Sequence, residues 1–176
     1  MKRSVMMLVA GLAAGGALAE PVKPAGDQSL ADLGPGKVLV GITYDELQAV
    51  MTPAGFTATP VTDGKGFEVL APGGYRFSAF LGDCPEGEAP RCESLRMISF
   101  TFNENSNVTL KSINDWNAQS WGARGFVSKD GTSQVLMDVS LTGGVTPAWV
   151  TQQLKNFDYW MTNYGSFVSG AKPRTE

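Results

Sequence analysis

The sequence predicts an α+β domain with a largely antiparallel sheet and three helices. Two Asp-Gly turns, at 63–64 and 130–131, each separate a pair of apolar segments, a strong short-range signal of a β-hairpin. A long segment near the end carries apolar residues at helical spacing and must bury that face on a sheet or on a partner. The elements run helix, four strands, helix, two strands, helix, an order typical of α+β domains.

The first helix begins at Thr43-Tyr44-Asp45-Glu46. Thr43 can accept a hydrogen bond from the amide of Glu46 while the Glu46 side chain reaches back, which makes a capping box. Pro53 and Gly55 end this helix. Its predicted apolar face comprises Leu47, Val50 and Met51.

Four strands are predicted next, over 56–61, 67–71, 75–81 and 95–102. Pro60 has no N–H to donate, so its strand belongs at an edge of the sheet. In the fourth strand, Ile98, Phe100 and Phe102 share one face because side chains alternate along a strand.

The second half begins with a helix over about 109–120, followed by a hairpin of strands 125–128 and 133–141. Thr146 caps the last helix and Pro147 lies in its first turn. The apolar stripe of this helix is the clearest in the chain: Val150, Leu154, Phe157, Met161, Tyr164 and Val168.

Composition excludes several classes of protein. The 176 residues are 43% hydrophobic and 18% charged, which describes one globular domain rather than a disordered or fibrous chain. The chain has no histidine, which excludes Ser-His-Asp and Cys-His catalysis and His-containing zinc sites. The formal charge of -3 gives no general attraction to nucleic acid or to anionic membranes.

The N-terminus has the three-part layout of a secretory signal peptide over residues 1–19. Lys2 and Arg3 precede a short apolar run, and Ala17-Leu18-Ala19 is a small-residue cleavage site. Cleavage after Ala19 leaves 12 basic and 17 acidic side chains, a formal charge of -5. We expect an exported, periplasmic or secreted protein without stable membrane insertion, comprising a flexible leader (20–41), one domain (42–168) and a polar tail (169–176).

Cys84 and Cys92 are the only cysteines, and a Pro- and Gly-containing loop separates them. In an oxidising compartment this pair should form a disulfide. A redox-active pair is the alternative. The spacing is not Cys-x-x-Cys, however, and Glu86, Glu88 and Glu93 would oppose thiolate formation.

A series of short motifs resembles the YbjN family, described as bacterial sensory transduction regulators: Asn114-Asp115-Trp116-Asn117, Gly122-Ala123-Arg124-Gly125-Phe126, Asp130-Gly131 and Gly143-Gly144-Val145-Thr146. The resemblance covers about Thr43 to Phe167. It implies the fold of the class I type III secretion chaperones, with three helices and five strands, and no catalytic residues. A signal peptide and a cysteine-closed loop depart from the better-known members and argue against a cytoplasmic signalling role.

No motif predicts catalysis, a cofactor or a metal. Asn103, Asn105 and Asn107 imitate the first ligands of a calcium loop. Val108 stands where that loop needs glycine, and Asn114 stands where it needs a bidentate glutamate. We therefore predict a protein that is not an enzyme and that has no cofactor or metal.

The second helix holds the candidate site: Asn114, Trp116, Asn117, Trp121 and Arg124. With Leu110 at zero and about 100° per residue, Asn114, Asn117 and Trp121 fall on the face that should be apolar. The asparagines either bond to backbone in the core or line a polar cleft walled by the tryptophans. By the same arithmetic Trp121 is expected in the core and Trp116 nearer the surface.

Two functions remain open at this point. One is a non-catalytic binding protein, chaperone-like or regulatory, that holds a protein or peptide on an apolar groove or sheet surface. The other is a small-molecule sensor or an unrecognised enzyme that uses the Asn/Trp cleft. A broad apolar face would favour the first and a deep polar pocket the second. We also expect a homodimer, because Trp149, Trp160 and Phe167 widen the apolar surface of the last helix.

Overall fold

The fold is seen in a computed structural model that describes residues 34–170 except 35, 63, 64, 88, 89, 101, 103–107 and 130. The predicted signal peptide, most of the leader and the last six residues lie outside the described residues. The Asn103–Asn107 segment and parts of both Asp-Gly turns lie outside them as well.

The order of elements confirms the predicted α+β class, with three α-helices and six strands in the described part of the chain. Strands on the two sides of each predicted Asp-Gly turn pair with each other as a hairpin. The elements are α1 (Tyr44–Met51), a 3₁₀ turn η2 (Thr52–Ala54), β1 (Thr57–Pro60), β2 (Phe67–Leu70), β3 (Arg76–Gly82), β4 (Ser94–Ser99), α2 (Leu110–Asn117), β5 (Arg124–Val127), β6 (Ser133–Ser140) and α3 (Pro147–Val168).

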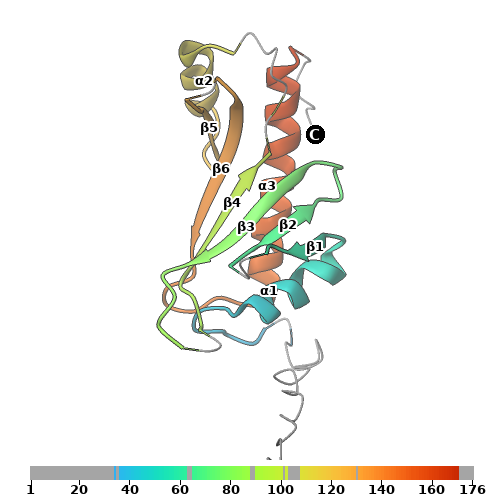
Figure 1. The fold of residues 1–176 in the computed structure, drawn as a ribbon, viewed down its shortest axis with the longest axis vertical. Helices are drawn as coiled ribbons and strands as arrows, with labels where there is room; N and C mark the ends of the chain where they lie inside the picture. Colours follow the sequence, from blue (N-terminus) through green and yellow to red (C-terminus); the bar gives the residue numbers. More distant parts are fainter. Residues whose placement is uncertain are drawn as a thin grey trace, which may run out of the picture.

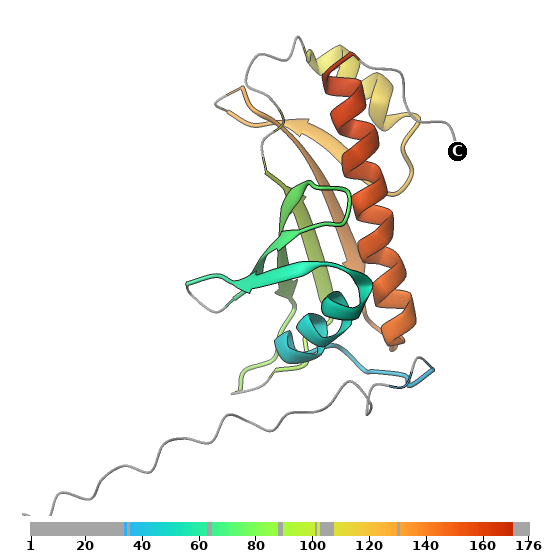
Figure 2. The ribbon, with the colours of Figure 1, turned by 90° about the vertical axis from the view of Figure 1, so that its right-hand side faces the viewer.

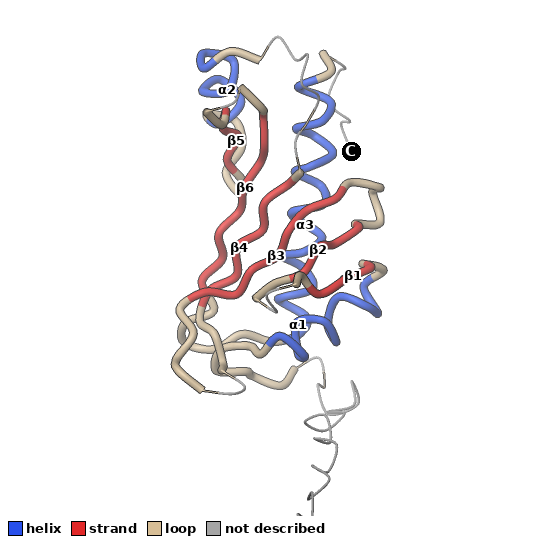
Figure 3. Tube along the Cα trace, viewed as in Figure 1, coloured by secondary structure: helices blue, strands red, loops and turns tan. Residues whose placement is uncertain are grey.

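The six strands form one sheet in the order β1-β2-β3-β4-β6-β5, and every pair in it is antiparallel (Figures 1 and 3). Pro60 lies in β1, an edge strand as predicted. The edge position suits proline because no ladder hydrogen bond is lost there. β5 forms the opposite edge and pairs with β6 from Arg124↔Leu136 to Val127↔Ser133.

The helices cover one face of this sheet. Figure 2 shows α1, α2 and α3 on the same side, with α3 running along the length of the sheet. The strand residues that face them are at most 7% exposed: Phe67, Val69, Phe77, Ala79, Leu81, Leu95, Met97, Val135, Met137 and Val139. Five members of the predicted α3 stripe are completely buried against them: Val150, Leu154, Phe157, Met161 and Tyr164.

The predicted caps are present. Thr43 and Glu46 form the capping box of α1, and the Thr146 side chain accepts from the N–H of Trp149 at the start of α3. Thr109 caps α2 with Ser112 in the reciprocal position. α2 ends at Asn117, three residues earlier than predicted.

The apolar alternation of β4 was assigned correctly only in part. Ile98 and Phe100 do share a face, and Phe100 is 42% exposed on the side away from the helices. Phe102 is 8% exposed and its ring packs edge-on against Tyr164 of α3. The chain leaves the regular strand after Ser99, so the alternation does not continue to Phe102.

The disulfide between Cys84 and Cys92 is present, as predicted, and closes the loop between β3 and β4. Cys92 is buried and exchanges two backbone hydrogen bonds with Ile42, just before α1. Within the described part of the chain, no helix has the length and apolar character needed to cross a membrane.

Candidate functional site

α2 packs on α3 through Trp116 rather than through the face predicted from the sequence. The Trp116 ring lies edge-on to Tyr164, with ring centroids 4.9 Å apart, and edge-on to Trp160 at 5.9 Å. Ile113 is 3% exposed on the same side of the helix, whereas Leu110 is 73% exposed. The prediction took Leu110 as the reference for the buried face of α2. Because Leu110 is exposed, the predicted buried face is rotated about the helix axis away from the observed one.

Asn117 has the structural role predicted for an asparagine in this helix. Its side-chain nitrogen donates to the carbonyl of Gly125 (3.1 Å), and its side-chain oxygen accepts from the N–H of Gly125 (2.7 Å). One amide side chain therefore satisfies both outward-facing backbone groups of a residue in edge strand β5. Gly125 is buried under the Tyr164 ring, which leaves no room for a Cβ.

The other predicted site residues are exposed. Asn114 lies at the surface and its side chain has no hydrogen-bond partner among the described residues. Trp121 is 95% exposed, so its predicted place in the core is wrong. The reason is that α2 ends at Asn117, and the helical spacing used to place Trp121 no longer applies beyond that point. Arg124 is exposed at the start of β5.

A cleft of about 660 Å³ lies between the end of α2 and strand β6. It brings together Asn117, Trp121 and Arg124 from the predicted site, but not Asn114 or Trp116. Its remaining lining is of mixed polarity: Ser120, Gly122, Ala123, Leu136, Met137 and Asp138. Because Trp121 is almost wholly exposed, its ring does not form the enclosing wall that a small-molecule pocket usually has.

The second candidate surface is the sheet face away from the helices, here called the uncovered face. Figure 1 looks onto it, with α3 running behind the strands. Three large apolar side chains are exposed on it, Leu70 (38%), Phe80 (36%) and Phe100 (42%). The pairing registers place the following residues on this face: Glu68, Leu70, Arg76, Ser78, Phe80, Arg96, Ile98, Phe100, Arg124, Phe126, Gln134, Leu136 and Asp138.

Charges on the uncovered face are partly paired. Arg96 and Asp138 lie opposite each other on β4 and β6 and make two hydrogen bonds, of 2.7 and 3.0 Å. Within the described part of the chain, neither Arg76 nor Arg124 has an acidic partner. The face therefore combines exposed aromatic rings with two free guanidinium groups on a chain whose formal charge is negative.

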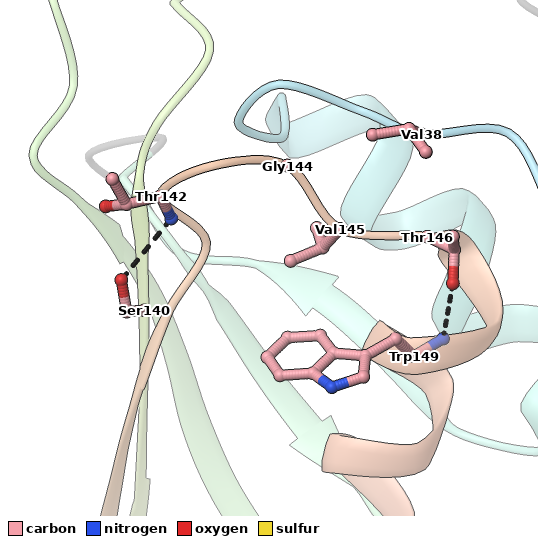
Figure 4. A pocket seen from close by; sticks show the side chains of 7 residues that line it. All are labelled: Val38, Ser140, Thr142, Gly144, Val145, Thr146 and Trp149. Atoms are coloured by element: carbon pink, nitrogen blue, oxygen red, sulfur yellow. Dashed lines mark hydrogen bonds between the residues drawn. The ribbon is translucent and has the colours of Figure 1, made fainter.

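A smaller cavity of about 390 Å³ lies at the far end of β6, where the chain turns into α3. Figure 4 shows the ring of Trp149 reaching from the first turn of α3 toward Ser140 and Thr142. Val38 and the 144–146 segment complete its lining. Trp149 is 38% exposed.

The comparison with known families gives one match. The family described as "YbjN: Putative bacterial sensory transduction regulator" matches residues 43–158, about two thirds of the chain. This chain belongs to the YbjN family. The matched region of this YbjN protein runs from the cap of α1 into the middle of α3. It includes the uncovered face, the larger cavity and the lining of the smaller cavity except Val38. No curated protein matches the sequence.

Sequence reasoning named a sheet surface as one candidate binding surface, but it did not identify the residues of the uncovered face of this YbjN protein. The signal was present in β3, where Phe80 alternates with the buried Phe77, Ala79 and Leu81 and so must point to the opposite side of the sheet. Arg76 and Ser78 lie on the same side of β3 as Phe80, so this side mixes polar side chains with an aromatic ring, whereas the other side is apolar. An aromatic ring on the polar side of a strand is a signal of a surface available for binding.

Proposed function

We propose that this YbjN protein is an exported, non-catalytic binding protein that holds another polypeptide against the uncovered face of its sheet. Membership of a family of bacterial sensory transduction regulators is consistent with a binding or regulatory role. A chaperone-like or a regulatory protein would use such a surface in the same way, by recognising a partner without changing it chemically.

The exposed side chains of Leu70, Phe80 and Phe100 carry this proposal. Leu70 and Phe80 lie on the adjacent strands β2 and β3, and Phe100 directly follows β4 and donates its N–H to the carbonyl of Arg76. Arg76 and Arg96 lie among these side chains. Aromatic residues and arginine are enriched at protein interfaces and supply most of the hot spots there. A broad face of this kind supports a polypeptide partner over a small molecule.

The Cys84–Cys92 disulfide and the N-terminal sequence pattern together support export to the bacterial periplasm. Structural disulfides persist in oxidising compartments and are rare in the bacterial cytoplasm. Purified periplasmic protein should begin at Glu20 and gain the mass of two hydrogen atoms on reduction. Protein that retains residues 1–19, or has free thiols when freshly isolated, would contradict export.

The binding surface is tested with the mature chain immobilised and exposed to periplasmic extract of its own bacterium. The captured proteins are quantified by mass spectrometry. Phe80→Ser combined with Phe100→Ser should reduce the retained partner by about tenfold or more, because central aromatic contacts dominate interface energies. Tyr159→Ser is the matched control, since Tyr159 is 43% exposed and belongs to α3, the helix on the other side of the sheet from the uncovered face.

Equal capture by the double variant and by the wild-type chain would overturn the proposal.

The predicted homodimer is checked in the same preparation by light scattering. The homodimer prediction rests on Trp149, Trp160 and Phe167. Trp160 and Phe167 pack against the core, and Trp149 is the most exposed of the three. If a second copy is the polypeptide that occupies the uncovered face, the double variant should be monomeric and Tyr159→Ser should remain dimeric.

A further inference from the structure

Strand β6 is longer than its neighbour β5, and part of its outer edge is therefore unpaired. β5 begins at Arg124, opposite Leu136, while β6 continues to Ser140. Figure 3 shows β5 beside only the upper part of β6. On its other side β6 stays paired with β4 through Ser94↔Ser140. The stretch 137–140, here called the free edge, has a neighbouring strand on one side only.

The backbone groups of two residues point outward from the free edge. Gly125 bonds to Asn117 on the side away from β6, so its neighbours Arg124 and Phe126 direct their backbone groups at Leu136 and Gln134. Backbone directions alternate along a strand. Asp138 and Ser140 therefore direct their backbone N–H and C=O groups to the same side of β6 as Leu136 and Gln134, but beyond the end of β5. No described residue accepts from or donates to the backbone groups of Asp138 and Ser140 on this side.

Empty space lies along this edge at both ends. The larger cavity, of about 660 Å³, is lined by Asp138 and by Trp121 and Arg124. The smaller one, of about 390 Å³, is lined by Ser140 and Thr142 and by Trp149 (Figure 4). An added strand would therefore find room beside Asp138 and beside Ser140, with an exposed tryptophan at each end.

The outer edge of β5 is closed at Gly125. Asn117 occupies both outward backbone groups of Gly125 with its side-chain amide. This amide does what a neighbouring strand would do, and it blocks pairing with another strand at this residue of β5. Exposed edges that have no partner are usually blocked in this way. The backbone groups of Asp138 and Ser140 on β6 lack such protection.

Arg124 gives the free edge a chemical preference at one end. It is the first residue of β5, its side chain is exposed, and it has no acidic partner in the described part of the chain. A strand added to the free edge antiparallel to β6 runs in the same direction as β5. The C-terminal end of the added strand would then lie beside Arg124. The segment that enters β5 through Ala123 would prevent the added strand from extending further.

We propose that the free edge of β6 binds the extended C-terminal segment of a partner polypeptide as an added antiparallel strand. Backbone groups of Asp138 and Ser140 pair with the segment, and the guanidinium of Arg124 receives its terminal carboxylate. Alternate side chains of the segment contact Trp149 on the helix side. The proposal rests on the proposed function only in that the partner is a polypeptide, since the contact surface is a different one.

The chemistry favours a carboxylate-terminated strand over other occupants. Main-chain pairing supplies affinity without demanding a particular sequence, and pockets at alternate positions supply selectivity. Arginine holds a carboxylate through two parallel hydrogen bonds. The chain as a whole is negatively charged, so an unpaired arginine beside an open edge gives a local attraction that most of the surface lacks.

The test uses random peptides of about eight residues displayed with free C-termini and selected on the mature protein. Binding of the selected peptides is then measured with two variants. Ser140→Pro removes the outward N–H without removing a ladder bond, because that N–H does not face β4. Ser140→Ala is the matched control, since both variants lose the hydrogen bond from Thr142 to the Ser140 side chain.

Ser140→Pro should weaken peptide binding by about tenfold relative to Ser140→Ala. Amidation of the peptide C-terminus should weaken binding to the wild-type protein by about tenfold as well. In Arg124→Gln the amidated and free peptides should bind alike. In the wild-type chain, saturating peptide should slow the hydrogen exchange of the Asp138 and Ser140 amides, a readout that does not depend on whether Ser140→Pro folds.

Unchanged exchange at both amides, or equal binding of the amidated and free peptides to wild-type protein, would overturn the proposal. So would a selection that enriches no peptide, or a concentration-dependent dimer that protects the same amides without peptide. The variant with Phe80→Ser and Phe100→Ser should still bind the selected peptides. Loss of extract capture in that variant with peptide binding intact separates the two surfaces, so either proposal can fail alone.

Discussion

The two faces of the sheet differ in what covers them and in composition, although both carry aromatic rings. The covered face is apolar, whereas the uncovered face mixes aromatic side chains with charged and polar ones. Phe77 and Phe80 lie three residues apart on β3, one completely buried beneath α3 and the other 36% exposed on the uncovered face. Phe77 lies edge-on to Phe157 of α3, with ring centroids 5.2 Å apart. The α3 side therefore determines the stability of the domain, while the other side leaves aromatic surface exposed.

The largest expected difference in stability is between the two variants in which either Phe77 or Phe80 is replaced by alanine. Phe77→Ala should lower the free energy of unfolding by about 3–5 kcal/mol, because it leaves a cavity between the sheet and α3. Phe80→Ala should lower it by about 1 kcal/mol or less. Urea unfolding of both variants measures the difference, and equal losses would show that the uncovered face is buried in the protein in solution.

The tryptophans at the end of α2 give the next largest difference. Trp116→Ala should cost about 3 kcal/mol, because its ring packs on Tyr164 and Trp160. Trp121→Ala should change the stability by about 0.5 kcal/mol or less, because the side chain is 95% exposed. Thermal unfolding followed by circular dichroism measures both variants. A lower melting temperature for Trp121→Ala than for Trp116→Ala would reverse this assignment.

The asparagines of α2 should differ by less than the tryptophans. Asn117→Ala leaves the N–H and carbonyl of the buried Gly125 without partners and should cost about 1–3 kcal/mol. Asn114→Ala removes an exposed side chain and is the control, with an expected change near zero. Hydrogen exchange at the Gly125 amide should accelerate only in Asn117→Ala, and protection of that amide in this variant would mean that another group closes the edge.

Local signals were sufficient to predict most of the fold. The capping box at Thr43 and Glu46 and the paired apolar segments at the two hairpins each depend on neighbours in sequence, and each is present in the structure. The stripe of α3 was predictable for the same reason, since helical spacing identifies a buried face without knowledge of its partner.

The candidate site was less predictable because it depends on contacts between distant segments. The sequence indicated that an asparagine of α2 would bond to backbone, and Asn117 does so. It could not indicate that Trp116 rather than Trp121 meets Tyr164, because that depends on where α2 ends and how it rotates against α3. The free edge of β6 was likewise hidden, since its exposure results from the shorter length of β5.

The smallest effect concerns a carboxylate on the covered side, where α3 meets the turn between β2 and β3. One side-chain oxygen of Asp158 accepts from the N–H of Gly73 at 3.1 Å, and the other is buried with no hydrogen-bond partner among the described residues. Burial raises the pKa of Asp158 above its ordinary value of 3.8, and the hydrogen bond from Gly73 opposes this only in part. The folded protein therefore holds this proton more tightly than the unfolded chain does.

A group of this kind favours folding most when it is protonated, so its contribution is present below the unfolded pKa and is lost as the pH rises through the raised folded pKa. Asp158→Asn keeps a carbonyl oxygen for Gly73 and removes the titration. From about pH 4 upward, the wild-type protein should therefore lose stability relative to Asp158→Asn, and the difference should level off once Asp158 is ionised. Urea unfolding across a pH series measures it. Glu86→Gln in the loop between β3 and β4 controls for the loss of one negative charge, because Glu86 is exposed and has no ion pair among the described residues. A wild-type protein that gains stability over Asp158→Asn in this range would show that the buried oxygen has a partner in solution.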